Sequence, residues 1–189
     1  MRRALTALAV AFVALAGAAG AQPVVVAGWR EIAWPYPRDA WPAGRAFRCE
    51  SETCGGEIEV YLRPKAGFCN CDSGVADDDE VDRVADLDLI SEQFAPLQAG
   101  HVIGIAGMSG RSRGYQLQMA DGSRHTAIGM AVSHRCDVLV AVAQGAGTAQ
   151  DVERAALAFL GTPEMAQWMN AASPGRWSGS PTSRWRTGR

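Results

Sequence analysis

The chain has 189 residues, of which 48% are hydrophobic, and a formal net charge of −2, so it is long and apolar enough to bury a core. Residues 50–92 hold thirteen acidic side chains against three basic ones, whereas residues 93–189 hold five acidic side chains against nine arginines. Nucleic-acid binding needs a concentrated basic face. The balance of charge therefore excludes nucleic acid as the main partner.

The first 21 residues have the pattern of a secretory signal peptide. Arg2 and Arg3 precede an uncharged apolar stretch, residues 4–18, and residues 19–21 are small, as at a cleavage site. The stretch is shorter than the roughly 20 residues of a membrane helix, although an uncleaved anchor is the alternative. We expect an exported protein, periplasmic or extracellular, whose mature chain has no transmembrane span and a formal charge of −4 once the two arginines are removed.

Residues 22–45 are rich in tryptophan and proline, which predicts an extended N-terminal arm laid over the domain, since proline interrupts helices and central strands. We expect the tryptophans to be packed against the domain. An aromatic platform for a ligand is the alternative.

Residues 57–63 alternate, with Ile58, Val60 and Leu62 on one face, and predict a half-buried antiparallel strand. Residues 46–50 are its expected hairpin partner, and residues 68–71 read as a short strand or a strand end. Next along the chain, a helix is expected to begin with Asp77 as its N-cap. Glu80, three residues later, completes a capping box, and Val81 and Val84 are on the inward side of the helix.

The second half of the chain is strand-rich. Strands are expected at 101–106, 114–119 and 124–133, with a hairpin turn at residues 120–123 and a central, fully covered strand at 136–143. Two helices follow, one capped by Thr148 with an apolar stripe (Val152, Ala155, Ala156, Phe159 and Leu160), and one starting at 162–164 with Met165, Trp168 and Met169.

These elements predict an α+β fold in which helices pack against an antiparallel sheet stapled by disulfides. The expected organisation is a signal peptide at 1–21, one domain at 22–172 and a disordered tail rich in arginine and tryptophan at 173–189.

All five cysteines, Cys49, Cys54, Cys69, Cys71 and Cys136, lie in the mature chain. In an exported protein this odd number predicts two disulfides and one remaining thiol. We expect one bridge between the pair Cys49/Cys54 and the pair Cys69/Cys71, and a second between the other member of Cys69/Cys71 and Cys136. A local Cys49–Cys54 bridge is the alternative.

A second hypothesis for these cysteines is a soft-metal or thiol-redox site. Cys69 and Cys71 are two residues apart, as are His134 and Cys136, so on a strand each pair faces one side. Thiolates in this arrangement suit Cu(I), so copper is the cofactor that this hypothesis implies. The spacings match neither a zinc cluster nor the Cys-x-x-Cys motif of thioredoxin-like enzymes.

Other candidate sites are less complete. Arg111 and Arg113 could hold an anionic group or pair with the acidic helix, and Asp77, Asp79 and Asp82 could form an irregular calcium loop. Ser109 lies in a near match to the nucleophile elbow of hydrolases, with three histidines as candidate bases: His101, His125 and His134.

Because the sequence has no complete catalytic constellation, the leading expectation is a non-enzymatic binding or accessory factor. The sequence does not identify its partner, and another exported protein is one candidate. A copper or thiol-redox protein using Cys69 and Cys71 is the first alternative, and a hydrolase is the second.

Overall fold

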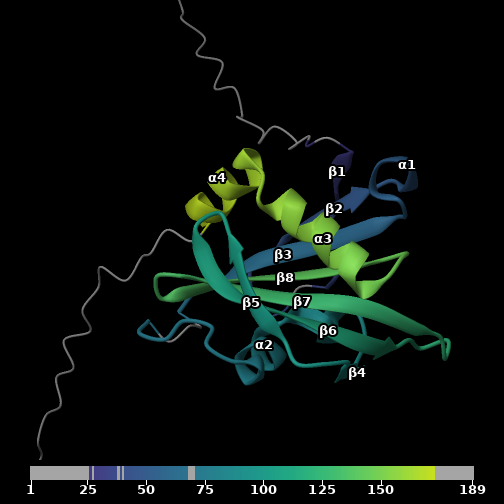
Figure 1. Cartoon of the computed structure of the whole chain (residues 1–189), viewed down its shortest axis with the longest axis horizontal. Coiled ribbons are helices and arrows are strands. Elements are labelled where there is room, and N and C mark those ends of the chain that lie inside the picture. Colours follow the sequence, from purple (N-terminus) through teal and green to yellow (C-terminus); the bar gives the residue numbers. More distant parts are fainter. Residues whose placement is uncertain (1–25, 27, 38, 40, 68–70, 173–189) are drawn as a thin grey trace, which may run out of the picture.

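The computed structural model of the chain describes residues 26, 28–37, 39, 41–67 and 71–172. These residues form one antiparallel sheet with strand order β1-β2-β3-β8-β7-β6-β4, and β5 also pairs with β6 (Figure 1). The strands are β1 (Trp29–Ile32), β2 (Arg45–Cys49), β3 (Ile58–Lys65), β4 (Gln93–Pro96), β5 (His101–Ile105), β6 (Met108–Gln118), β7 (Arg124–His134) and β8 (Asp137–Gly145). The helices are α1 (Ser51–Cys54), α2 (Asp78–Val84), the 3₁₀ helix η1 (Asp86–Leu89), α3 (Ala149–Leu160) and α4 (Pro163–Ala172). The predicted α+β class with an antiparallel sheet is confirmed.

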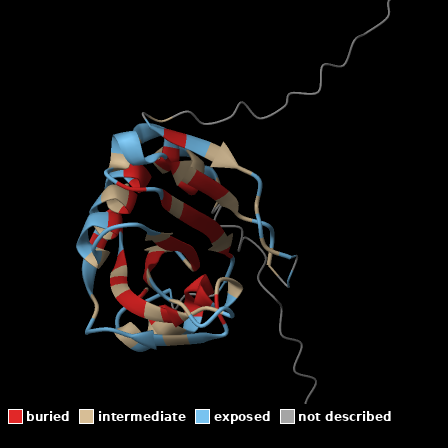
Figure 2. Ribbon diagram, turned by 90° about the vertical axis from the view of Figure 1, so that its right-hand side faces the viewer, coloured by how far each residue is buried: buried red, intermediate tan, exposed pale blue. Residues whose placement is uncertain are grey.

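Both faces of the sheet are covered, so the molecule has three layers. Helices α3 and α4 pack on one face, here called the helical face, over a core that includes Phe47, Leu62 and Phe159. The opposite face, here called the arm face, is covered by α2, η1 and the described residues of the arm (33–37, 39 and 41–44), over a core that includes Leu87 and Tyr115. Figure 2 shows the buried residues along the strands and on the sides of the helices that face them.

The predicted hairpin of residues 46–50 and 57–63 is present as β2 and β3, joined by the short helix α1. The strand predicted at residues 57–63, observed as β3, was expected to be half-buried, and this prediction is wrong. Ile58, Val60 and Leu62 lie on the helical face as expected, but Tyr61, Arg63 and Lys65 on the other face are also buried. The alternating pattern identified the two faces correctly but could not show that the arm covers the second one.

The predicted arm contains a strand that was not expected. Residues 29–32 form β1, which pairs with β2 at the edge of the sheet. Residues 33–37 then cross β3, where the rings of Trp34 and Tyr36 pack edge-on against Tyr61 with centroids 6.3 and 5.0 Å apart. The expectation that the tryptophans are packed against the domain is met here and by Trp29, which is buried.

Helix caps and turns follow the local sequence. The Asp77 carboxylate accepts a hydrogen bond from the Glu80 backbone N–H at 2.9 Å, and the Thr148 hydroxyl accepts one from the Asp151 N–H at 3.2 Å. The predicted turn at 120–123 joins β6 to β7, with Gly122 at a φ of 84°. Strand β6 starts at Met108, so the predicted strand 114–119 is only its second half.

Several predictions fall on residues outside the described part of the chain: the signal peptide at 1–21, the tail at 173–189, and residues 68–70 of the expected short strand. Cys71, the described end of that strand, lies in a turn. No helix in the described ranges is long and apolar enough to cross a membrane.

Candidate functional site

A groove of about 690 Å³ lies between α1, the start of β1 and α3. Its floor contains Trp29 and Phe159, whose rings stack with centroids 4.3 Å apart. Small side chains line much of its walls: Thr53, Gly55, Ala146, Gly147, Ala155, Ala158 and Thr162. The volume falls in the range of small-molecule sites, which are commonly concave and mostly apolar with a few polar groups.

The groove is shaped by local features of three separate segments. The disulfide between Cys49 and Cys54 ties α1 to the end of β2, with α-carbons 6.1 Å apart. On the opposite wall, Ala155 and Ala158 present only methyl groups one helical turn apart. Asp151 and Arg154 form an exposed ion pair of 3.1 Å among the lining residues. The site therefore combines an aromatic floor with one cation and one anion.

The sequence did not predict this groove. Ala155 was assigned to the apolar stripe of its helix, and Trp29 to packing against the domain, with an aromatic ligand platform as the alternative. One sequence feature could have indicated the groove: the small residues at 145–147 are followed by small residues on one side of the next helix.

The two disulfides of the described residues are Cys49–Cys54 and Cys71–Cys136. The expected bridge between the pair Cys49/Cys54 and the pair Cys69/Cys71 is wrong, because the short connection through α1 brings Cys54 back beside Cys49. The bridge from Cys71 to Cys136 agrees with the expectation. The fifth cysteine, Cys69, lies outside the described residues.

The predicted copper ligands are partly brought together. Cys71 and Cys136 are joined to one another, and His134 lies two residues before Cys136 at the end of β7. Two hydrogen bonds flank the bridge: Gly67 N–H donates to Asp137 at 2.8 Å, and Val75 N–H donates to Ser133 Oγ at 2.7 Å. Because sulfurs in a disulfide are not thiolates, copper binding at Cys69, Cys71, His134 and Cys136 stays a prediction for the reduced chain.

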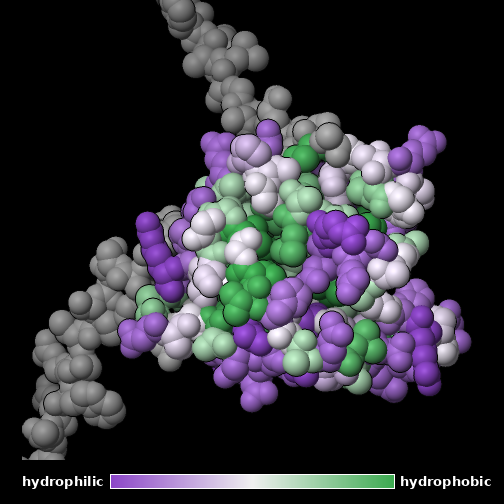
Figure 3. All heavy atoms as spheres, viewed as in Figure 1, coloured by the Kyte–Doolittle hydropathy of each residue, from purple (hydrophilic) through white to green (hydrophobic). Residues whose placement is uncertain are grey.

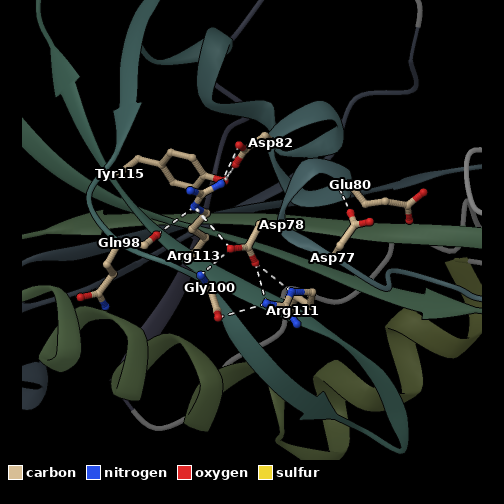
Figure 4. Close-up of polar contacts among 9 residues, drawn as sticks. All are labelled: Asp77, Asp78, Glu80, Asp82, Gln98, Gly100, Arg111, Arg113 and Tyr115. Atoms are coloured by element: carbon tan, nitrogen blue, oxygen red, sulfur yellow. Dashed lines mark hydrogen bonds and ion pairs between the residues drawn. The ribbon is translucent and has the colours of Figure 1, made fainter.

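Arg111 and Arg113 pair with the acidic helix, the second of the two arrangements considered for them. Figure 4 shows both guanidinium groups pointing from β6 toward carboxylates of α2. Arg111 lies 2.6 Å from Asp78, and Arg113 lies 2.7 Å from Asp82. The hydrogen bond from the Gly100 N–H, together with the Arg111 guanidinium, lowers the pKa of Asp78.

These contacts also bear on the calcium hypothesis. Asp77 caps α2 and Asp82 binds both Arg113 and the Tyr115 hydroxyl, which donates at 2.5 Å. Burial and the bond to Asp82 raise the pKa of Tyr115. In the described ranges no group of three or more His, Cys, Asp or Glu side chains is arranged to hold a metal ion.

A buried ionic cluster on β3 was not anticipated from the sequence. Asp86 of η1 accepts two hydrogen bonds from Arg63, at 2.7 and 2.8 Å, and lies 2.7 Å from the Lys65 ammonium. Asp39 of the arm binds Arg63 from the other side at 2.7 and 2.8 Å. The bonds from Arg63 lower the pKa of Asp39 to about 2. Two cations and two anions balance, so the cluster attaches the arm and η1 to the sheet.

The hydrolase residues are not assembled into a catalytic arrangement. Ser109 lies within β6 and not at a turn between a strand and a helix. Among the described residues, which include all three histidines, no hydrogen bond joins Ser109 to a histidine. His101 instead lies 3.3 Å from Glu153 of α3, which also accepts a hydrogen bond from Ser112.

Comparison with known proteins gives little further information. No family model matches the chain, and neither does any curated protein. Among solved structures, the chain is similar to PA94, a Pseudomonas aeruginosa protein of unknown function, at 18% identity over 69% of this chain and 76% of that one, with a TM-score of 0.32. A likeness this weak carries no argument on fold or function.

Proposed function

We propose that the chain is an exported, non-enzymatic binding protein whose groove over Trp29 and Phe159 takes a ligand with an apolar body. The groove itself carries the proposal, because a concavity of about 690 Å³ lined largely by apolar and small side chains has the volume and lining of a small-molecule site. The signal-peptide pattern of residues 1–21 and the two disulfides support export.

The lining residues define the chemistry of the ligand. The rings of Trp29 and Phe159 lie almost buried beneath the groove. The small residues of α3 therefore leave room for an apolar group and supply part of the apolar surface that it would contact. Arg154 can donate charge-assisted hydrogen bonds to an anionic end, at the expense of its exposed pair with Asp151. An apolar ligand with one acidic group satisfies both features.

The test fills the groove. Replacement of Ala158, an exposed residue of the wall, by Trp places a large ring where the ligand would lie. Gln150→Trp on the same helix is the matched control, because Gln150 is exposed and is not among the lining residues. The probe is 8-anilinonaphthalene-1-sulfonate, an apolar dye with an anionic group, whose fluorescence reports binding.

We expect the Ala158→Trp variant to bind the dye about tenfold more weakly, which corresponds to about 1.4 kcal/mol, while Gln150→Trp binds as the parent does. Circular dichroism should show both variants folded. Equal dye binding by the parent and Ala158→Trp would disprove the groove as the binding site.

A further inference from the structure

Strand β5 is an open edge of the sheet. In the described part of the chain it pairs only with β6, from His101 opposite Ser112 to Ile105 opposite Met108. His101, Val102 and Gly104 are exposed, whereas Ile103 and Ile105 are buried on the helical face. This edge is separate from the groove proposed above.

The turn that follows β5 fixes which backbone groups face outward. Ala106 and Gly107 have positive φ angles of 53° and 80°, as in a two-residue hairpin turn. Residues flanking such a turn exchange both backbone hydrogen bonds, and the pattern alternates along the strand. The N–H and C=O groups of Ile105 and Ile103 thus point to β6, and those of Val102 and Gly104 point to the open side.

These four outward groups have no backbone partner in the described residues. Unpaired groups of this kind are a template for another strand, and proteins usually guard them with charges or proline. Strand β1 carries Arg30 and Glu31, and β4 carries Pro96. Strand β5, with the sequence His-Val-Ile-Gly-Ile, has neither.

One of the two outward-facing residues of this edge also has an unusually exposed side chain. Val102 is 69% exposed, the larger of two such values among the described large hydrophobic residues. Figure 3 shows hydrophobic side chains gathered on the face of the molecule where β5 lies. A single exposed hydrophobic residue is common on protein surfaces, so the unguarded row of backbone groups, and not Val102 alone, marks the edge as an interaction site.

The edge is held in shape by the contacts of Arg111 and Arg113. Between β4 and β5 the chain bulges away from β6, and the carbonyls of Gly100 and Gln98 accept hydrogen bonds from the two arginines at 3.1 and 2.9 Å. The Gly100 N–H donates to Asp78 at 2.8 Å. The bulge therefore ends the edge at His101, and the turn ends it at Ile105, which leaves about 17 Å of strand.

We propose that β5 binds an extended segment of a partner polypeptide, which adds to the sheet as an antiparallel strand. Only another strand backbone offers donors and acceptors in the spacing of Val102 and Gly104. A Cβ built on Gly104 has no neighbour nearer than 3.9 Å, so a large side chain of the partner can cover this glycine. The partner segment carries apolar residues at alternate positions, beside Val102 and over Gly104.

A second copy of the chain is a poorer occupant. Two five-residue strands bury much less than the roughly 1,200–2,000 Å² of stable complexes. A flexible segment of a larger partner needs no such area from this edge alone, since other contacts add to its affinity.

The experiment uses the folded chain and the peptide acetyl-Thr-Val-Thr-Phe-Thr-Val-Thr-amide as probe. Amide hydrogen exchange is followed by NMR with and without the peptide. We expect slower exchange, by about tenfold or more, at Val102 and Gly104, because their N–H groups become donors. A peptide with N-methyl groups on alternate residues, which cannot pair along one edge, is the matched control and should give no protection.

Two variants at Val102 distinguish strand addition from nonspecific hydrophobic binding. Val102→Lys places a guarding charge at the edge and should weaken peptide binding about tenfold, whereas Val102→Thr, which keeps the β-branched shape, should weaken it less. Ala158→Trp in the groove should leave peptide binding unchanged, so this proposal and the groove can fail separately.

Three results would overturn the proposal. The amides of Val102 and Gly104 could stay unprotected at saturating peptide, or the N-methylated control could protect them equally. Protection that grows with protein concentration alone, with a doubled mass in sedimentation, would assign the edge to a second copy instead.

Discussion

Two groups of basic side chains on the arm face of the sheet, Arg63 with Lys65 and Arg111 with Arg113, both pair with carboxylates but differ in burial. Arg63 on β3 and its partner Asp86 have side chains only 3% and 8% exposed. On β6, the side chains of Arg111 and its partner Asp78 are 17% and 22% exposed. Both groups attach a connecting segment to the sheet, the first holding the arm and η1 and the second holding α2 and the bulge before β5.

The difference in burial changes what each ion pair contributes. Around Arg63 the charges have left water, so each depends on its partner, and the removal of one leaves another without compensation. Around Arg111 water screens the charges, and the pair adds less to stability. The buried group therefore fixes the fold, while the more exposed group shapes an edge that remains open to a partner.

The largest expected effect follows from Asp86→Ala. This change leaves Arg63 and Lys65 buried beside one another with only Asp39 to balance them. We expect the free energy of unfolding to fall by about 3–5 kcal/mol. Urea titration under non-reducing conditions measures it. A loss below about 1 kcal/mol would show that the cluster is solvated.

The matched change in the more exposed group is Asp78→Ala, which removes the hydrogen-bond acceptor of Arg111 and of the Gly100 N–H. We expect a loss of about 1–2 kcal/mol in the free energy of unfolding. The loss should shrink at high salt, because the pair is partly exposed, whereas the loss from Asp86→Ala should not. Equal salt dependence of the two variants would contradict the comparison.

The sequence predicted the parts of this arrangement that depend on local pattern. The capping of α2 by Asp77 and the strand containing Ile58, Val60 and Leu62 needed only neighbouring residues. The pairing of Arg111 and Arg113 with the acidic helix was one of two alternatives, since charge alone does not decide between a protein carboxylate and an outside anion.

The parts that it missed depend on segments far apart in the chain. Arg63 looked solvent-facing because alternation shows which face a residue takes and not what covers that face. The groove forms only where Trp29, α1 and α3 come together in the fold. No single stretch of the sequence shows that these segments are neighbours. The disulfide pairing differs for a local reason: Cys49–Cys54 was only the alternative, because it depends on the path of α1, which the spacing of the cysteines does not specify.

Acid should weaken the buried group through Asp39. The bonds from Arg63 lower its pKa from 3.8 to about 2, so its contribution is fully present above pH 3.8 and is lost as the pH falls toward 2. Because the Asp39 side chain is 35% exposed, we expect only about 1 kcal/mol after allowance for screening. The measurement is the difference in unfolding free energy between the parent and Asp39→Asn. This free-energy difference should become smaller as the pH falls from 3.8 toward 2. A difference that stays constant would show that the Asp39 carboxylate does not stabilise the cluster.

The smallest expected effect tests how the second group is anchored. The Tyr115 ring is fully buried, and its hydroxyl donates to Asp82, which also binds Arg113. Tyr115→Phe keeps the ring and removes only the donor, so we expect a loss of about 1 kcal/mol in unfolding free energy. Because Arg113 still holds Asp82 and the Gln98 carbonyl, amide exchange at Val102 and Gly104 should not change. If their exchange did change, the shape of the β5 edge would depend on Tyr115 as well as on Arg111 and Arg113. The contacts that stabilise the fold and those that shape the edge would then not be separate at Tyr115.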